Sequence, residues 1–274
     1  MTFFDCLAGC GGGRLGFERA GHVCVDSCEV AQWPRKVYAE HFKKEPRWKD
    51  VKDIEYKKVP DFDFLIAGLP CQPFSTANTT GVRGFNRKDA LVFFDVLRLI
   101  KNKRPKFILF ENVQGVLSDS QGRSFATWLL HLQEVGYDAE WAYFNGQSFG
   151  LRCGHEHIFL IGWDNKKICP EKVLPNRERP TIRSFASFKK ERKVIQRITT
   201  QERAGFDNST TILDEYGFRT LVPEEKEALL GLPSGWTANA PEAARDRMLG
   251  NVWPPVMAEY LGRNVLPNEP TNRI

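Results

Sequence analysis

Short apolar runs alternate with amphipathic stretches over the first 163 residues of the chain. The apolar runs predict strands at residues 3–7, 22–25, 62–67, 107–110, 139–145 and 157–162. Between them, apolar positions three or four residues apart predict helices at residues 15–20, 32–42, 91–102 and 125–135. Strands that alternate with helices in this way are typical of an α/β fold built around a parallel sheet.

The alternation stops at residue 164 and the pattern stays irregular to about residue 218. This stretch is rich in charge and proline, which predicts an inserted segment or a small, mostly irregular subdomain. A helix is expected at residues 224–230, ended by Gly231-Leu232-Pro233, and a last helix at residues 256–261.

Composition describes an ordinary globular protein. The chain has 274 residues, of which 42% are hydrophobic and 27% charged, enough for one large domain or one domain with a small annex. It has neither a membrane-length apolar run nor a signal peptide at its start, so we expect a soluble intracellular protein, in the cytoplasm or nucleoid, or in a nucleus. Seven cysteines without CxxC spacing indicate reduced thiols, and we expect no metal ion.

The charge is unevenly distributed. A net charge of +5 permits nucleic-acid binding without requiring it. Basic residues gather in one stretch, which is either a solvated surface or a site for the backbone of a polyanion. The basic residues predicted to bind nucleic acid are Arg177, Arg179, Arg183, Lys189, Lys190, Arg192, Lys193 and Arg197.

A glycine-rich turn, Leu-Ala-Gly-Cys-Gly-Gly-Gly at residues 7–13, directly follows the first predicted strand. Glycines let a backbone approach a ligand closely and leave the start of the next helix accessible. Glu29 follows the second strand, where an acid can accept hydrogen bonds from ribose hydroxyls, and Asp50 ends the next unit. Together these residues favour a nucleoside cofactor.

A second motif, Gly-Leu-Pro-Cys-Gln-Pro-Phe-Ser at residues 68–75, follows the third strand. Its Cys71 lies on a loop at the carboxyl edge of the sheet, where a thiolate is accessible. The fourth strand ends in Glu111-Asn112-Val113, and a glutamate there can protonate or hydrogen-bond a heterocycle in the same cleft.

The order of these motifs, with a late Gly-Asn at residues 250–251, resembles the cytosine-5 DNA methyltransferases. The resemblance runs from residue 3 to about residue 265 and lacks only the long insert of larger members. It implies a Rossmann-like class I methyltransferase sheet and S-adenosylmethionine as the methyl donor. It also implies that Cys71 adds to carbon 6 of a flipped cytosine and that Glu111 holds or protonates ring nitrogen 3.

The resemblance also implies a set of cofactor neighbours. Some would surround the methionine end, others the ribose, the adenine or the remaining faces of the cofactor. Trp253 stands where a smaller aliphatic residue is usual, and it is either a core aromatic or a cofactor contact. The implied neighbours are Leu7, Ala8, Gly9, Gly11, Glu29, Val30, Asp50, Val51, Pro70, Val92, Asn251 and Trp253.

One segment departs from the family pattern. Where the family has Gln-x-Arg-x-Arg, this chain has Cys153-Gly154-His155-Glu156-His157. In the family the second arginine supports the carbonyl oxygen of the base, so His155 and His157 become candidate catalytic residues. A histidine can donate the same hydrogen bond, but its charge depends on pH, whereas that of arginine does not. The departure leaves open reduced activity or a different pyrimidine substrate.

The resemblance divides the chain into a catalytic and cofactor-binding domain at 1–162 plus 250–274, and a short target-recognition region with its closing motif at 163–249. We expect a monomer that acts on double-stranded DNA. Two alternatives remain: methylation of tRNA cytosine by the RNA-directed branch of the family, and a weak or inactive nucleic-acid binder with the same fold. Intact Pro-Cys-Gln and Glu-Asn motifs argue against the inactive binder.

Overall fold

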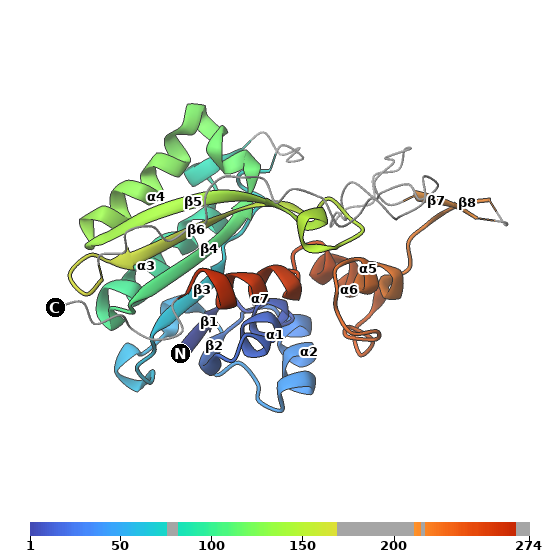
Figure 1. Cartoon of the computed structure of the whole chain (residues 1–274), viewed down its shortest axis with the longest axis horizontal. Coiled ribbons are helices and arrows are strands. Elements are labelled where there is room, and N and C mark those ends of the chain that lie inside the picture. The colour runs from blue at the N-terminus through green and yellow to red at the C-terminus, as the bar shows by residue number, and fades with distance from the viewer. Residues whose placement is uncertain (76–81, 169–210, 215–216, 267–274) are drawn as a thin grey trace.

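The computed structural model describes residues 1–75, 82–168, 211–214 and 217–266 (Figure 1). At 211–214 and 217–218 it describes the backbone alone. The predicted strands and helices are present, with ends that differ from the predicted ones by at most three residues. The strands are β1 (Thr2–Cys6), β2 (Val23–Cys28), β3 (Phe64–Gly68), β4 (Phe107–Val113), β5 (Tyr137–Asn145), β6 (Glu156–Asp164), β7 (Thr211–Asp214) and β8 (Gly217–Thr220). The α-helices are α1 (Gly12–Arg19), α2 (Gln32–Phe42), α3 (Val92–Lys103), α4 (Arg123–Glu134), α5 (Pro223–Leu229), α6 (Glu242–Leu249) and α7 (Pro255–Asn264).

Six strands form one sheet in the order β2-β1-β3-β4-β6-β5. The first four are parallel neighbours, but β6 runs antiparallel to both β4 and β5. The expected parallel sheet is therefore present in β2, β1, β3 and β4, whereas β6 runs against both of its neighbours. Residues 146–155 join β5 to β6, and a parallel crossover needs a dozen or more residues, so this connection permits only an antiparallel pair.

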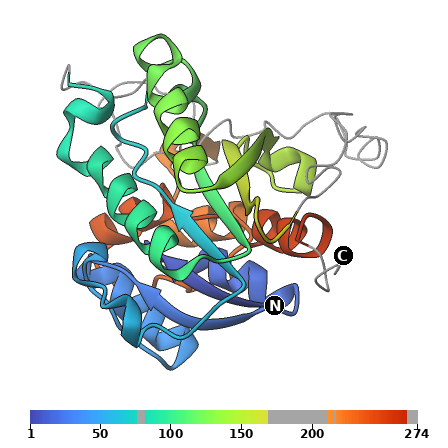
Figure 2. The same cartoon turned by 90° about the vertical axis from the view of Figure 1, so that its left-hand side faces the viewer.

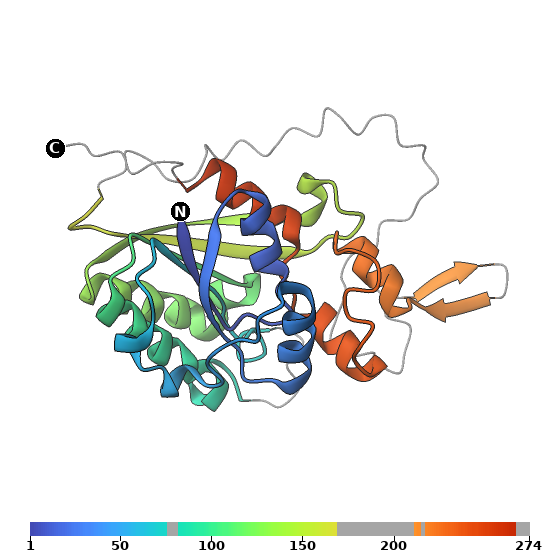
Figure 3. The ribbon, with the colours of Figure 1, turned by 90° about the horizontal axis from the view of Figure 1, so that it is seen from below.

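Both faces of the sheet are buried, and successive residues of a strand alternate between them. Phe3, Phe64 and Phe107 pack on the face covered by α1 and α7, whereas Phe4, Leu65 and Ile108 pack on the opposite face. Helices α3 and α4 cover that opposite face, and Figures 2 and 3 show the two layers of helices on either side of the strands. The fold is thus a three-layer α/β sandwich, as predicted.

Glycines in α1 let the C-terminal part of the chain pack closely on it. A Cβ at Gly12 would lie 2.3 Å from the carbonyl oxygen of Trp253, and one at Gly16 would lie 2.3 Å from that of Pro255. Helix α7 consequently lies against α1, although the two are far apart in sequence. This contact places Trp253, at the entrance to α7, beside the carboxyl edge of the sheet.

Helices α5 and α6 pack against α2 and the glycine-rich turn. Leu230, Trp236 and Leu249 share an apolar cluster with Cys10 and Val37. The indole N–H of Trp236 also donates to the carbonyl oxygen of Cys10, at 2.9 Å. The division of the chain at residues 163 and 249 stays a prediction.

The prediction missed helix α6 and, at the end of the segment predicted to be irregular, both strands of a hairpin. Strand β7 pairs antiparallel with β8, and this hairpin extends away from the sheet (Figures 1 and 3). Each strand has four residues, too few for a recognisable period of two, which is why the pattern did not indicate it. Within the described residues, no helix has the length and apolar character to cross a membrane.

Candidate active site

A cavity of about 560 Å³ opens at the carboxyl ends of β1, β3 and β4. This edge is where ligands bind in open α/β sheets, and the volume lies in the range of small-molecule sites. Most of the predicted site residues line it, although they come from widely separated parts of the chain. The predicted residues in its wall are Leu7, Ala8, Gly9, Glu29, Val30, Pro70, Cys71, Glu111, His157, Asn251 and Trp253.

Within the described part of the chain, five predicted site residues do not line the cavity. Gly11 has a φ of 88° and faces Phe42, Asp50 accepts a hydrogen bond from the Lys52 amide, and Val51 is buried in the core. Val92 begins α3 and packs on the same core, and His155 lies buried behind the wall. Their roles toward a ligand stay predictions. The residues concerned are Gly11, Asp50, Val51, Val92 and His155.

Glu29 holds the glycine-rich turn in place. One carboxylate oxygen accepts from the Gly9 amide at 2.8 Å, and the other accepts from the Ala31 amide at 2.7 Å. Burial raises the pKa of Glu29, and these backbone donors oppose that rise. Gly9 has a φ of 55°, and a Cβ added there would meet no atom within 4 Å, so its backbone faces open space in the cavity. Each oxygen of Glu29 keeps a lone pair for a ligand hydroxyl.

Asp5 also lines the cavity, although it was not among the residues predicted from the sequence. Its side chain is buried, and its Oδ2 has no hydrogen-bond partner among the described residues. Burial raises the pKa of Asp5 to about 7, while the charge of Arg14 acts in the opposite direction. The available signal was an acidic residue inside an otherwise apolar strand. Other cavity residues without a sequence signal are Trp33, Arg247 and Met248.

Asn112 anchors the loop that carries Cys71. Its side-chain amide donates to the carbonyl oxygens of Leu69, at 3.0 Å, and Pro70, at 3.4 Å. After Cys71 the chain turns, and the amides of Phe74 and Ser75 donate to the Cys71 carbonyl oxygen at 3.0 and 2.9 Å. The thiol of Cys71 reaches Asn251 Oδ1 at 3.7 Å. The Asn of Glu-Asn-Val thus positions the Cys of Pro-Cys-Gln.

Cys71 differs from the other described cysteines. Burial raises the pKa of Cys10 and Cys24 to about 12 and that of Cys153 to about 11, which leaves those thiols protonated near neutral pH. Cys6 and Cys28 are fully buried, and burial raises their pKa values as well. Cys71 is partly exposed in the cavity wall.

Glu111 is held by a residue from the other end of the chain. The indole N–H of Trp253 donates to Glu111 Oε2 at 2.8 Å, and both side chains are buried. Gly68 lies beside Glu111 in the sheet, and a Cβ there would come within 2.9 Å of the Trp253 nitrogen. Trp253 also packs on Phe17 and Phe159. It is therefore both a core aromatic and a cavity residue.

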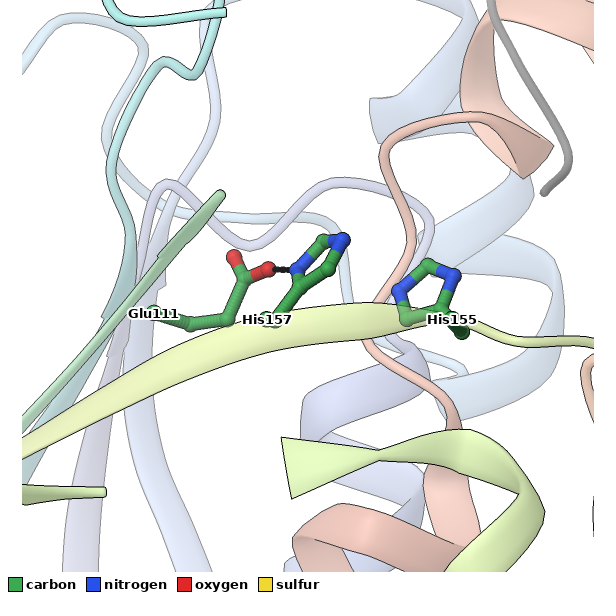
Figure 4. Close-up of side chains that lie close together, drawn as sticks. All are labelled: Glu111, His155 and His157. Carbon is green, nitrogen blue, oxygen red and sulfur yellow. Dashed lines mark ion pairs between the residues drawn. The ribbon is translucent and has the colours of Figure 1, made fainter. Parts of the chain in front are cut away.

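The two histidines lie next to Glu111. Nδ1 of His157 is in direct contact with Glu111 Oε1, and the ring of His155 stacks on that of His157 at 4.0 Å between centroids (Figure 4). Burial lowers the pKa of His155 to about 4, so its ring is neutral near pH 7. The basic residues predicted to bind nucleic acid, 177–197, lie outside the described part of the chain.

These groups give the cavity two chemically different halves. Glu29, Asp5 and open backbone at Gly9 offer acceptors and donors to a polar ligand. Cys71 and Glu111 place a nucleophile and a proton donor or acceptor in the other half. The arrangement suits a covalent reaction on a polar ring beside a bound second substrate.

Comparison with known proteins agrees with this chemistry. The family model described as C-5 cytosine-specific DNA methylase matches residues 1–202. The Type II methyltransferase M1.ScrFI of Lactococcus lactis subsp. cremoris is 40% identical over 165 residues, which cover 60% of this chain and 42% of the relative. M.BsuFI of Bacillus subtilis is 39% identical over 163 residues, covering 60% of this chain and 39% of the relative. The matched region thus spans about two fifths of these curated relatives.

Solved structures share the fold over nearly the whole chain. The Entamoeba histolytica methyltransferase EhMeth superposes with a TM-score of 0.70 at 15% identity, covering 97% of both chains. Dnmt2 methyltransferase of S. pombe superposes with a TM-score of 0.66 at 15% identity, covering 96% of this chain and 97% of the other. Because the family model matches most of the chain, and the fold and the motif residues agree with it, the chain belongs to the C-5 cytosine-specific DNA methylase family.

Proposed function

We propose that this chain transfers a methyl group from S-adenosylmethionine to carbon 5 of a cytosine in double-stranded DNA. The main support is that Cys71 and Glu111 line one cavity. The bonds from Asn112 to the Cys71 loop add to it, because they couple the positions of the two reactive side chains. Addition across a ring double bond requires a nucleophile and an acid in fixed positions relative to each other.

In the proposed reaction the thiolate of Cys71 attacks carbon 6 of the base and forms a C–S bond. Glu111 holds or protonates ring nitrogen 3, so that the electron pair displaced from the C5–C6 double bond is stabilised in the ring. Carbon 5 then takes up the methyl group, a base removes the proton from carbon 5, and elimination of Cys71 restores the double bond. The cytosine must leave the helical stack to reach the cavity.

The cofactor would occupy the half of the cavity next to the glycine-rich turn. Glu29 would accept hydrogen bonds from the ribose hydroxyls, and the open backbone at Gly9 leaves room for the methionine portion. The buried, unpaired Oδ2 of Asp5 is an acceptor for an amino group in the same region. When bound, S-adenosylmethionine supplies an electrophilic methyl group on a sulfonium.

DNA as the substrate is supported by the family description and by relatives named as Type II methyltransferases. The predicted basic stretch would then contact phosphates, which contribute affinity without reading sequence. We expect the short target-recognition region to contact few bases.

A covalent trapping assay tests the proposal. Duplex DNA with 5-fluorocytosine at the target position should form an adduct with the protein that survives denaturation, provided that the cofactor is present, because fluorine cannot leave as a proton does. The adduct should be absent from Cys71→Ala and should persist in Cys24→Ala, the matched control. An adduct with RNA alone would move the substrate to RNA, and the absence of any adduct would contradict the proposed enzyme.

A further inference from the structure

Three side chains that can bind a metal ion meet beside the cavity: Glu111, His155 and His157. Their donor atoms all lie within 4.8 Å of one another. Glu111 comes from β4 and His157 from the neighbouring strand β6, which runs antiparallel to it. His155 precedes His157 by two residues, so both imidazoles lie on the same side of the chain (Figure 4).

His155 is buried, with only 3% of its surface exposed, and its Nε2 has no hydrogen-bond partner among the residues that the structure describes. One of its ring nitrogens points toward His157 (Figure 4). A buried polar atom without a partner is costly, and in native proteins such an atom calls for a specific explanation. A metal ion bound at Nε2, in the plane of the His155 ring, would supply the missing partner.

Two imidazoles and one carboxylate form a donor set that zinc and neighbouring divalent transition metals favour. Each donor lies about 2.0 to 2.2 Å from a zinc ion, so two donors on one ion are about 3 to 4 Å apart. The donor atoms here all lie within 4.8 Å of one another, close to that spacing.

The surroundings of Glu111 also fit a ligand. The indole of Trp253 donates to Oε2, which leaves Oε1 directed at His157. Such a neighbouring donor typically orients a ligating carboxylate. Glu111 and His157 line the cavity, so a remaining coordination position would face the space in which a base would bind.

We propose that Glu111, His155 and His157 form a binding site for one divalent transition-metal ion of the zinc class. Both histidines stand where the related enzymes have arginines, so a bound ion would return positive charge beside Glu111. The inference does not depend on the proposed methyl transfer, because metal binding is measured without cofactor or DNA.

The test is titration of the metal-free protein with Zn²⁺ by calorimetry and with Co²⁺ by visible absorption. We expect one ion per chain and a Co²⁺ spectrum of nitrogen and oxygen ligands, without the thiolate charge-transfer band that cysteine ligands produce. His155→Phe keeps an aromatic ring stacked on His157 but removes both ring nitrogens. It should weaken Zn²⁺ binding by roughly 100-fold or more, because loss of a residue that only supports a ligand already costs about 10- to 100-fold.

His157→Gln is a second variant, at a less buried position, and should weaken binding similarly. His131→Phe is the matched control: His131 also pairs with a glutamate, Glu134, but lies on the surface of α4 without a third donor among the described residues. It should bind as the wild type does. Circular dichroism establishes that each variant is folded. No binding, a thiolate band, or wild-type affinity in a folded His155→Phe would each overturn the proposal.

Discussion

The two halves of the cavity are built in different ways. The half next to the glycine-rich turn comes from neighbouring strand–turn–helix units, and its contacts are largely backbone groups, such as the Gly9 and Ala31 amides on Glu29. The other half joins side chains from distant segments: Trp253 bonds Glu111 across 142 residues, and Cys71 reaches Asn251 across 180. The first half follows from local sequence, whereas the second exists only when the whole domain is folded.

The largest effect is expected from Cys71→Ala, which should abolish methyl transfer because no described thiol near it can replace the nucleophile. Cofactor binding should be nearly unchanged, since the proposed role of the thiol is to attack the base and not to hold the cofactor. Transfer of a radiolabelled methyl group measures the half with Cys71 and Glu111, and calorimetric titration with cofactor measures the half next to the glycine-rich turn. Turnover above a few per cent of wild type would contradict the role of Cys71.

Glu111→Gln should slow the reaction by roughly 10²–10⁴, the usual scale for losing a positioned acid or base. The amide oxygen can still accept from Trp253, so the fold should persist. Single-turnover kinetics with saturating cofactor measure this step. An unchanged rate constant would show that Glu111 takes no part in proton transfer.

Glu29→Gln should instead affect the cofactor half alone. In the wild type, each carboxylate oxygen of Glu29 accepts a hydrogen bond from a backbone amide. The NH₂ group of glutamine cannot accept, so one of these bonds is lost, and the dissociation constant for S-adenosylmethionine should rise roughly 10- to 100-fold. The rate at saturating cofactor should change little. Glu55→Gln, at an exposed position, is the control. A large fall in that rate with unchanged cofactor affinity would mean that the two halves are not separable.

The smallest effect concerns stability. The folded pKa of Asp5 is about 7, above its ordinary 3.8, so the folded state keeps a proton that the unfolded chain releases. Stability should fall as pH rises from about 4 to 7 and then level off. Asp5→Asn cannot ionise and should be more stable at pH 8 by roughly 1–2 kcal/mol, less than the full shift implies because the cavity is open.

Thermal melts across this pH range measure that difference. Asp61→Asn is the control, because Asp61 is exposed and Lys103 lowers its pKa, so it titrates below the window. If Asp5→Asn shows the same slope of stability against pH as the wild type, the buried carboxyl does not hold its proton.

The sequence alone was sufficient for the order of strands and helices over the first 163 residues, because alternation of apolar positions and turn residues is local. It also predicted that the chemistry lies at the carboxyl ends of the first four strands, since carboxyl ends of parallel strands share one edge. Cys71, Glu111 and Glu29 were identified on that basis, and all three line the cavity. The direction of β6 was missed, because pairing depends on the partner strand and on connection length.

Tertiary packing settled what no local pattern indicates. The glycine-rich turn was interpreted as space for a ligand, and Gly12 near its end does line the cavity. The fold adds a second reason for glycine, because Gly12 and Gly16 make room for the chain around Trp253 and α7. Asp5 looked like an ordinary strand residue until the fold placed it in the cavity wall. The meeting of His155 and His157 with Glu111 depends on β4 and β6 being neighbours. The local pattern depends on residues a few positions apart in the sequence. Burial and side-chain contacts depend on residues from distant segments, which only the assembled sheet and its helices bring together.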